Sequence, residues 1–472
     1  MPPRSRTKLF VLFVLVLLLA VVGSVSYLGW RQSVPPPTVT STPPRALGHK
    51  TALPISVQAA HGNVAGVDIR IVQGGKSVVV VKQDGVLGHR VDLPAMLEIS
   101  NLGLREGPAS IEVRARDDFW RPLKLPERVV ATWPVTIDLT PPKIEVLAST
   151  GYYSPGGVAL VAFRVEGAVK SDVKVGDNVF PSFAIGAADR GARVALLALP
   201  YDYNGAALAI SAVDEVGNVA NRGIPGELKP RRFPHDRIEI RDSFLQAKVP
   251  ELLPQHPPGA PLLDGFLVIN REQRKQAEAE KRKLSAKTSD KPLWEGAFVQ
   301  PRNTKVFANF AETRTYVYQG REIDTQVHYG YDLASTKQSP VPAANKGVVV
   351  FAGPLSIYGN AVVLDHGLGL QTLYGHLSSF DVKVGDPVDK EQKLGHTGST
   401  GLAIGDHLHY EVLVNGISVT PLEWWDAKWM RDRINKPLKD AGLPEVAGLE
   451  RGGAADDDEK PAKPAPRRRR AR

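Results

Sequence analysis

The sequence predicts a mainly β protein that is tethered by an N-terminal transmembrane helix and built from several modules. Residues 9–30 form an uncharged apolar stretch that is long enough to cross a bilayer as a helix. Residues 53–225 contain short β-branched runs separated by Gly, Asp and Pro, a pattern typical of strands joined by turns. The chain has 472 residues, which is too long for one ordinary core and favours roughly two to four domains.

The composition is that of a globular protein, with 43% hydrophobic and 23% charged residues. There is no cysteine, so any metal site must use His, Asp or Glu. The net charge of +9 includes the basic run Arg467–Arg470, which follows the acidic run Asp456–Glu459. We interpret these runs as a solvated tail, with attraction to anionic membrane or cell-wall polymers as the alternative. No nucleic-acid recognition motif accompanies the charge, so nucleic acid is not an expected partner.

The apolar stretch 9–30 is predicted to be an uncleaved anchor in the inner membrane. Three basic residues lie in segment 1–8, so the positive-inside rule keeps that segment in the cytoplasm and the rest of the chain outside. A cleavable signal peptide is the competing interpretation, with Ser24 and Ser26 as small residues for a cleavage site. The apolar run is longer than a usual signal sequence, which favours the anchor.

A Pro-rich linker, 31–52, precedes two predicted β-sandwich modules, 53–141 and 142–225. The clearest strand candidates are Ser77–Val81, Ala109–Val113, Val129–Ile137 and Val158–Val165. Ser110–Asp118 is similar to Leu208–Val216, since in each an alternating strand runs into an acidic turn. The joint Asp138–Pro142, together with Ala212–Asn218, resembles bacterial immunoglobulin-like repeats. The resemblance implies a spacer or a binding module and no particular ligand. Envelope proteins are the partners that we consider for such a module.

Residues 226–300 are predicted to be a helical, Pro-rich linker. Glu272–Lys287 is made of strong helix formers and is highly charged. Because it has few apolar residues to bury, we expect an exposed helix between the β modules and the region that follows.

Residues that can carry chemistry gather near the C-terminus. Of the eleven histidines, six lie between His328 and His409. His328 and Asp332 form an HxGxD motif, and a neutral imidazole and a carboxylate are both good metal ligands. His407 and His409 are two apart at the start of a predicted strand, so both face one side. His376 lies in the same histidine-rich region and is therefore a further candidate for the site.

Several spaced motifs resemble the lysostaphin-like (LytM-type) zinc endopeptidases, which cut the peptide part of peptidoglycan. The resemblance covers Thr325–Pro421, about a fifth of the chain. In order, the motifs are HYGYDLAS from His328, PVPAANKGVVVFAG from Pro340, YGNAVVLDHGLGLQTLYGHLS from Tyr358, VKVGDPVDKEQKLGHTGSTG from Val382 and GDHLHYEVLVNG from Gly405. The resemblance implies that residues 301–425 form a β-rich zinc peptidase domain.

Carried over by position, the resemblance makes His328, Asp332 and His409 the ligands of one zinc ion. It makes His376 and His407 the catalytic histidines. Three protein ligands leave a fourth position open, which is typical of a catalytic zinc site. HExxH with its Glu base is absent, so either histidine is a candidate base.

Three positions beside the histidine pair depart from the family pattern. Asp406 stands where Pro is more usual, and Ala403 and Ile404 replace small, commonly hydroxylated residues. We expect these changes to alter substrate fit and to remove no ligand. His366 is expected to be structural and His396 to face solvent.

The leading hypothesis is a membrane-anchored zinc metalloendopeptidase that hydrolyses peptidoglycan cross-links beyond the membrane. One alternative is a non-enzymatic regulator that activates a cell-wall amidase, but such regulators typically lose ligands. The other is an adhesion protein in which the β modules matter most. Beyond the peptidase domain we expect a helix, 426–442, and a disordered charged tail, 443–472.

Overall fold

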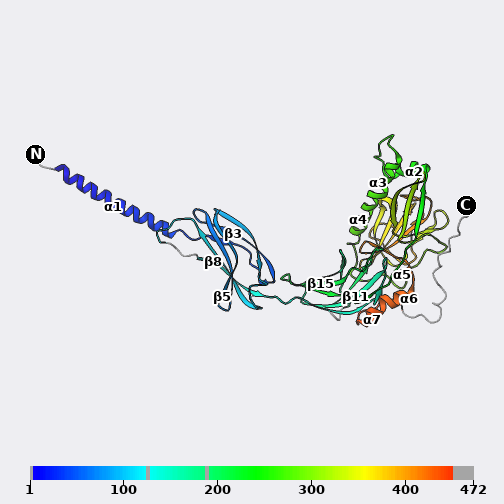
Figure 1. Cartoon of the computed structure of the whole chain (residues 1–472), viewed down its shortest axis with the longest axis horizontal. Coiled ribbons are helices and arrows are strands. Elements are labelled where there is room, and N and C mark those ends of the chain that lie inside the picture. The colour runs from blue at the N-terminus through cyan, green and yellow to red at the C-terminus, as the bar shows by residue number, and fades with distance from the viewer. Residues whose placement is uncertain (1–3, 124–127, 187–190, 450–472) are drawn as a thin grey trace. The chain divides into compact units, whose positions relative to one another are not determined.

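A computed structural model describes residues 4–123, 128–186 and 191–449 (Figure 1). The prediction of a mainly β protein with an N-terminal apolar helix is confirmed. The chain divides into two compact units, Met1–Pro142 with Val213–Val219 and Lys143–Ala212 with Ala220–Arg472. The module boundaries given above stay predictions.

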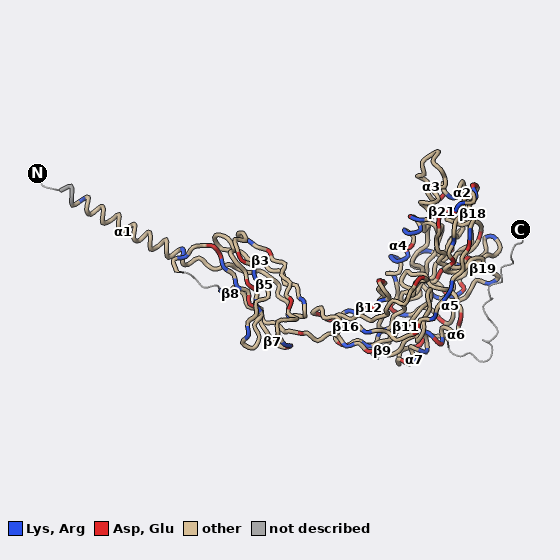
Figure 2. The backbone as a smooth tube through the Cα atoms, viewed as in Figure 1, with Lys and Arg blue, Asp and Glu red and all other residues tan. Residues whose placement is uncertain are grey.

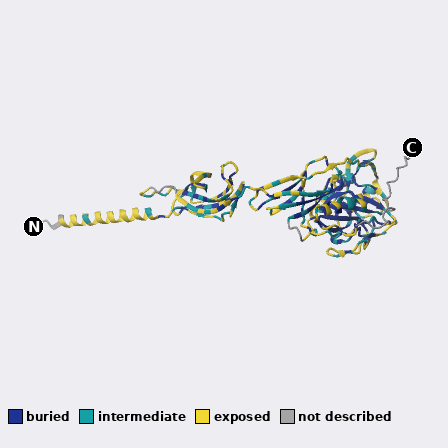
Figure 3. Cartoon of the chain, turned by 90° about the horizontal axis from the view of Figure 1, so that it is seen from below, coloured by how far each residue is buried: buried dark blue, intermediate teal, exposed yellow. Residues whose placement is uncertain are grey.

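The N-terminal helix α1 spans Arg4–Ser33. Its segment Thr7–Ser33 is the one helix within the described residues that is long and apolar enough to cross a membrane. Its large side chains are exposed along the whole segment (Figure 3), and charged residues lie only near its ends (Figure 2). Length and composition of this kind are those of a membrane-spanning helix.

The first unit continues as two antiparallel sheets that enclose one core. One sheet has the order β1-β3-β6, and the other has the order β2-β8-β7-β4-β5, in which only β2 and β8 are parallel. Residues alternate along the strands, so that one face of each sheet is buried. The strands are β1 (Thr38–Thr40), β2 (Ala46–Leu47), β3 (Lys50–Gln58), β4 (Val64–Gln73), β5 (Lys76–Gly88), β6 (Arg90–Glu98), β7 (Gly107–Asp117) and β8 (Arg128–Ile137).

The second unit begins with a further set of short strands. They form sheets of order β14-β11-β9 and β13-β12-β15-β16 and a small pair β10-β17. The strands are β9 (Lys143–Ser149), β10 (Tyr152–Tyr153), β11 (Val158–Glu166), β12 (Lys170–Val175), β13 (Asn178–Pro181), β14 (Ala192–Ala198), β15 (Leu208–Val213), β16 (Val219–Gly223) and β17 (Glu227–Leu228). The buried side chains of β11 and β14 belong to the same core as those of the C-terminal sheet.

The C-terminal part is organised by an eight-stranded sheet of order β19-β22-β30-β26-β25-β24-β28, in which β31 pairs with β30. Two smaller sheets, β18-β20-β21 and β23-β29-β27, flank it. The central strands β25, β26 and β30 are buried on both faces. The strands are β18 (His235–Ile240), β19 (Lys305–Ala308), β20 (Glu312–Tyr318), β21 (Arg321–His328), β22 (Tyr331–Ala334), β23 (Pro340–Pro342), β24 (Gly347–Pro354), β25 (Asn360–Gly367), β26 (Leu370–Leu377), β27 (Ser379–Phe380), β28 (Pro387–Val388), β29 (Lys393–His396), β30 (Leu408–Val414) and β31 (Ile417–Val419).

The helices of this part lie before and after the sheet in sequence. They are α2 (Asp242–Leu252), α3 (Leu262–Val268), the π-helical turn η1 (Ile269–Gln273), α4 (Arg274–Leu284), the 3-10 turn η2 (Ser356–Tyr358), α5 (Leu422–Trp425), α6 (Ala427–Met430), the π-helical turn η3 (Arg431–Asn435) and α7 (Lys436–Asp440).

The expectation that the charged segment is an exposed helix is wrong in one respect. Helix α4 carries many basic residues (Figure 2), yet one face of it is buried. Ala277, Lys281 and Leu284, spaced four and three residues apart, form this face. Lys281 is fully buried because two carboxylates, those of Glu278 and Glu411, pair with its ammonium group. The sequence of the helix could not show the second partner.

The prediction of a disordered tail from residue 443 is wrong for the first residues of that segment. Leu443, Val446 and Leu449 are buried in the core of the second unit, since their apolar side chains recur every three residues and pack against it. Most of the tail, residues 450–472, lies outside the described residues.

Candidate metal centre and catalytic site

The HxGxD motif is a tight connection between two strands. His328 ends β21, and Asp332 lies in β22 directly opposite His409 of β30. A Cβ on Gly330 would lie 2.5 Å from the carbonyl oxygen of Tyr410 and 2.8 Å from the ring of His409. Only glycine therefore allows the connection to pass this close to β30.

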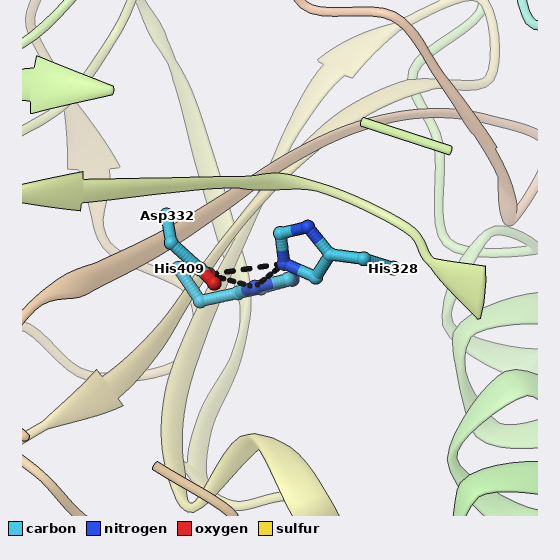
Figure 4. Close-up of side chains that lie close together, drawn as sticks. All are labelled: His328, Asp332 and His409. Carbon is cyan, nitrogen blue, oxygen red and sulfur yellow. Dashed lines mark hydrogen bonds and ion pairs between the residues drawn. The ribbon is translucent and has the colours of Figure 1, made fainter. Parts of the chain in front are cut away.

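Three potential ligand atoms converge at this point (Figure 4). Nε2 of His328 lies 3.0 Å from Oδ1 of Asp332 and 3.1 Å from Nδ1 of His409. The same carboxylate oxygen lies 2.9 Å from Nδ1 of His409. All three residues are buried.

The outer atoms of these side chains have fixed partners. Nδ1 of His328 donates to the carbonyl oxygen of Asn309 at 2.9 Å, and Nε2 of His409 donates to Glu411 at 2.8 Å. Each imidazole then presents an unprotonated nitrogen to the centre, beside a carboxylate oxygen. Three lone-pair atoms that face one another in this way can be satisfied by coordinating one divalent cation.

The pKa values fit this assignment of charge. Burial lowers the pKa of His328 to about 4, so this imidazole is neutral at physiological pH. Burial acts to raise the pKa of Asp332, but the electrostatic interaction with His328, together with the side-chain contacts to His328, His407 and His409, outweighs it and holds the pKa well below its usual range. For His409 burial acts to lower the pKa, and the bonds to Asp332 and Glu411 outweigh it and raise the pKa. Without a metal ion, His409 can therefore take up a second proton at Nδ1, and metal binding would displace that proton to free the nitrogen as a ligand.

Glu411 is the centre of a second layer behind the ligands. It is fully buried and also accepts hydrogen bonds from Tyr358 at 2.6 Å, Ser418 at 2.8 Å and Lys281 at 2.9 Å. Burial acts to raise the pKa of Glu411, but the Lys281 charge, the interactions with His409 and the hydrogen bond from Tyr358 together outweigh it and lower the pKa. The carboxylate is therefore ionised and fixes the orientation of His409.

Asp332 has a second partner as well. Arg314 on β20 donates to its Oδ2 at 2.9 Å and lies 3.5 Å from Glu312. This pairing leaves Oδ1 directed at the two imidazoles.

The two further predicted histidines lie beside the ligands. The ring of His376 is 4.9 Å from that of His407 and 5.7 Å from that of His409, between centroids. Nδ1 of His376 donates to the carbonyl of Thr400 at 2.8 Å, and Nδ1 of His407 donates to that of Gly405 at 2.7 Å. Each ring therefore keeps Nε2 as the atom that can exchange a proton.

His376 is held in an uncommon backbone conformation. Its φ of 63° is in the left-handed region, which residues other than glycine rarely adopt. Burial lowers its pKa well below the usual value, and His407 adds to this effect. Backbone strain of this kind concentrates at functional sites.

Helix α2 holds the loop that contacts His376. Lys248 donates to the carbonyl of Ser399 at 2.6 Å, and Glu251 accepts from the amide of Gly401 at 2.8 Å. Thr400, between these residues, accepts the hydrogen bond of His376. The helix thus supports the position of this histidine through one loop.

The positions that depart from the expected pattern lie in the same loop. Asp406 accepts from the hydroxyl of Thr397 at 2.6 Å and from the amide of Gln338 at 3.1 Å. It therefore connects neighbouring loops instead of contacting the ligands. Ile404 is 72% exposed and Ala403 is buried.

Sequence reasoning missed several of these residues. Glu411 lies two residues after His409, so strand alternation could have placed it on the same face. Lys281, Arg314 and Glu251 left no such signal, because their partners are distant in sequence. His366, expected to be structural, is buried and bonds to the carbonyl of Lys346 and to Thr372.

Comparison with known sequences identifies this region. The sequence model "Peptidase family M23" matches residues 326–421. These residues are an M23 peptidase domain. The predicted metal ligands and catalytic histidines all lie within it, namely His328, Asp332, His376, His407 and His409.

Curated relatives of the M23 domain include enzymes of bacterial cell-wall metabolism. "DD-carboxypeptidase/endopeptidase Mpg" of Neisseria meningitidis serogroup B is 43% identical over 97 residues, which are 21% of this chain and 22% of the relative. "Peptidoglycan DD-endopeptidase ShyA" of Vibrio cholerae is 41% identical over 96 residues, 20% of this chain and 22% of the relative. The chain thus matches about a fifth of the length of these relatives.

A solved structure is also similar to this domain. The catalytic domain of lysostaphin from Staphylococcus simulans is 32% identical, with 26% of this chain and 92% of that chain covered and a TM-score of 0.23. The sequence match and the curated relatives, which also include lysostaphin at 40% identity over 99 residues, identify the domain as an M23 metallopeptidase domain.

Proposed function

We propose that this chain is a membrane-anchored zinc metalloendopeptidase that hydrolyses amide bonds in the peptide cross-links of peptidoglycan. The observation that carries the proposal is the convergence of Nε2 of His328, Oδ1 of Asp332 and Nδ1 of His409 as three buried acceptors. These residues would hold the zinc ion. When bound, zinc acidifies a coordinated water and polarises the scissile carbonyl.

The protein's own residues supply the remaining steps. His376 and His407 each present Nε2 to the site and are each oriented by a backbone carbonyl that accepts a hydrogen bond from Nδ1. The histidine that acts as base takes the proton of the attacking water on an unprotonated Nε2 and returns it to the leaving amine. The other donates to the developing oxyanion from the form that carries a proton on Nε2. Glu411 and Arg314 keep the ligands His409 and Asp332 aligned.

The substrate class follows from the relatives, whose names include a peptidoglycan DD-endopeptidase and a DD-carboxypeptidase/endopeptidase. We propose D,D cross-links as the bonds that are cut. The α1 helix would anchor the chain in the inner membrane with segment 1–8 in the cytoplasm and the M23 domain beyond the membrane. Binding of envelope proteins by the β modules stays a prediction.

The decisive test is digestion of purified sacculi by the zinc-loaded full-length protein, followed by mass analysis of the fragments. We expect cross-linked dimers to be converted to monomers with a free D-alanine carboxylate at the former cross-link. Intact cross-links after incubation with fully zinc-loaded protein would favour the alternative, a non-enzymatic regulator. The masses of the fragments also identify the bond.

A further inference from the structure

A loop of the first β module exposes large apolar side chains. It follows β7, and in it Trp120 is 56% and Leu123 is 70% exposed. Isolated exposed apolar residues are common on protein surfaces. The exposure of Trp120 and Leu123 becomes informative because this loop lies close to the point where the chain leaves α1.

The loop is fixed to the segment that leaves α1. Arg121 is paired with Asp117 at 2.7 Å and donates to the carbonyl of Pro35 at 3.2 Å. It also donates to the carbonyl of Val34, a residue that is itself buried in this unit. Val34 is four residues beyond Trp30, so at most about 14 Å of extended chain separates the two. The loop therefore lies close to the end of the apolar helix whatever direction the helix takes.

Aromatic side chains join the loop and the helix end. The ring of Phe119 lies 6.2 Å from that of Trp30, and the guanidinium of Arg31 lies 4.2 Å from the centre of the Phe119 ring. Arg31 also donates to the carbonyl of Trp120 at 2.9 Å. Trp and Tyr at the end of a transmembrane helix belong in the interface between acyl chains and water, and here Tyr27 and Trp30 occupy that position.

We propose that Phe119, Trp120 and Leu123 insert into the headgroup region of the membrane that α1 spans, so that the first β module rests on the bilayer surface. The proposal depends on the membrane anchor of the proposed function. The partner is lipid because the exposed aromatic surface of the loop continues the apolar surface of α1. Aromatic and aliphatic side chains of this kind bind membranes by burial at the headgroup boundary. The module is then held at two points, and its motion about residues 31–34 is restricted.

The absence of cysteine from the chain allows a direct test. Single cysteines at Leu123→Cys, Val22→Cys and Met96→Cys in the full-length protein would carry an environment-sensitive fluorophore. The protein is reconstituted into phosphatidylethanolamine–phosphatidylglycerol vesicles that contain spin-labelled lipid. Val22 lies within α1. Met96 is the control position because it is exposed (52%) and distant from the loop. It lies six residues along β6 from Arg90, a rise of about 20 Å. The residue before Arg90, His89, contacts Gly62 at the loop end of the module.

We expect a blue-shifted emission and a loss of fluorescence at position 123 with headgroup-attached spin labels. Position 22 should be quenched more by mid-chain spin labels, and position 96 should be unchanged. Adding Trp120→Ser to Leu123→Cys should reduce the quenching at position 123.

The other outcomes overturn the inference in distinguishable ways. Quenching at position 22 without quenching at position 123 leaves the anchor intact and contradicts the loop insertion. A blue shift at position 123 without quenching by lipid indicates a protein surface in place of lipid. Equal quenching at positions 123 and 96 means that the whole module lies flat and the loop has no special role. No quenching at position 22 contradicts the membrane anchor itself.

Discussion

The ammonium group of Lys281 lies 2.9 Å from the carboxylate of Glu411, and both side chains are fully buried. The pair connects helix α4, which precedes the M23 match, to the carboxylate that holds His409, one of the proposed zinc ligands. The site therefore depends on residues outside the segment that defines the family.

Lys281→Met should destabilise the protein strongly, because it leaves Glu411 buried without its main compensating charge. We expect the free energy of unfolding to fall by about 3–5 kcal/mol, measured by urea denaturation. Lys283→Met is the matched control on the same helix, since Lys283 is 74% exposed and pairs only at the surface with Glu280. It should change stability by less than about 1 kcal/mol. Equal effects of the two substitutions would refute the role of the buried pair.

Glu411→Gln should weaken zinc binding more than it weakens folding. The amide can still accept from His409 but no longer carries the charge that favours a good ligand. We expect the dissociation constant for zinc to rise about 10- to 100-fold, measured by competition with a chelator. Glu423→Gln is the control, because Glu423 is a buried carboxylate that pairs with Arg231. Unchanged zinc affinity in Glu411→Gln would show that the orientation of His409 does not depend on this charge.

Loosening the loop that α2 holds should slow hydrolysis while zinc stays bound. In the double variant Lys248→Met and Glu251→Gln, the loop 399–401 loses its charged contacts, and the carbonyl that orients His376 moves with it. A displacement of about 1 Å can cost up to about 100-fold in rate, so we expect kcat to fall between roughly 10- and 100-fold. Gln246→Ala, an exposed position of the same helix, is the control. Loss of zinc from the double variant would mean that the helix supports the ligands instead.

His366 should make the protein less stable in mild acid. Burial lowers its pKa to about 4 in the folded state, whereas the ordinary value is about 6.5. Between these values the unfolded chain binds more protons, so stability falls as the pH falls through this window. For His366 the loss at pH 5 is about 2 kcal/mol.

Urea denaturation of the zinc-loaded protein at pH 7 and pH 5 measures this effect. The wild type should lose about 2 kcal/mol more than His366→Gln over this interval. His396→Gln, at the partly exposed end of β29, is the matched histidine control. The same pH dependence in His366→Gln would assign the loss to other groups.

The features that could be predicted from the sequence are those that depend on the pattern of neighbouring residues. Alternation placed His407 and His409 on one side, and the two rings do lie 3.4 and 2.9 Å from the same oxygen, Oδ1 of Asp332. The four strand candidates of the β modules all lie within strands. Residues such as Lys281 and Glu251 could not be predicted, because their functional neighbours are about 130 and 150 residues away in sequence. The charged sequence of α4 predicts an exposed helix, and only the structure shows that Glu411 pairs with Lys281 in the core.

The central claim is that Asp332 and His409 hold zinc while His407 acts on the substrate. Zinc content and sacculus digestion, measured side by side in Asp332→Ala, His409→Ala and His407→Ala, test it most directly. We predict that the first two lose both zinc and hydrolysis, and that the third loses hydrolysis and retains zinc. Full hydrolysis in any of the three variants would contradict the assignment.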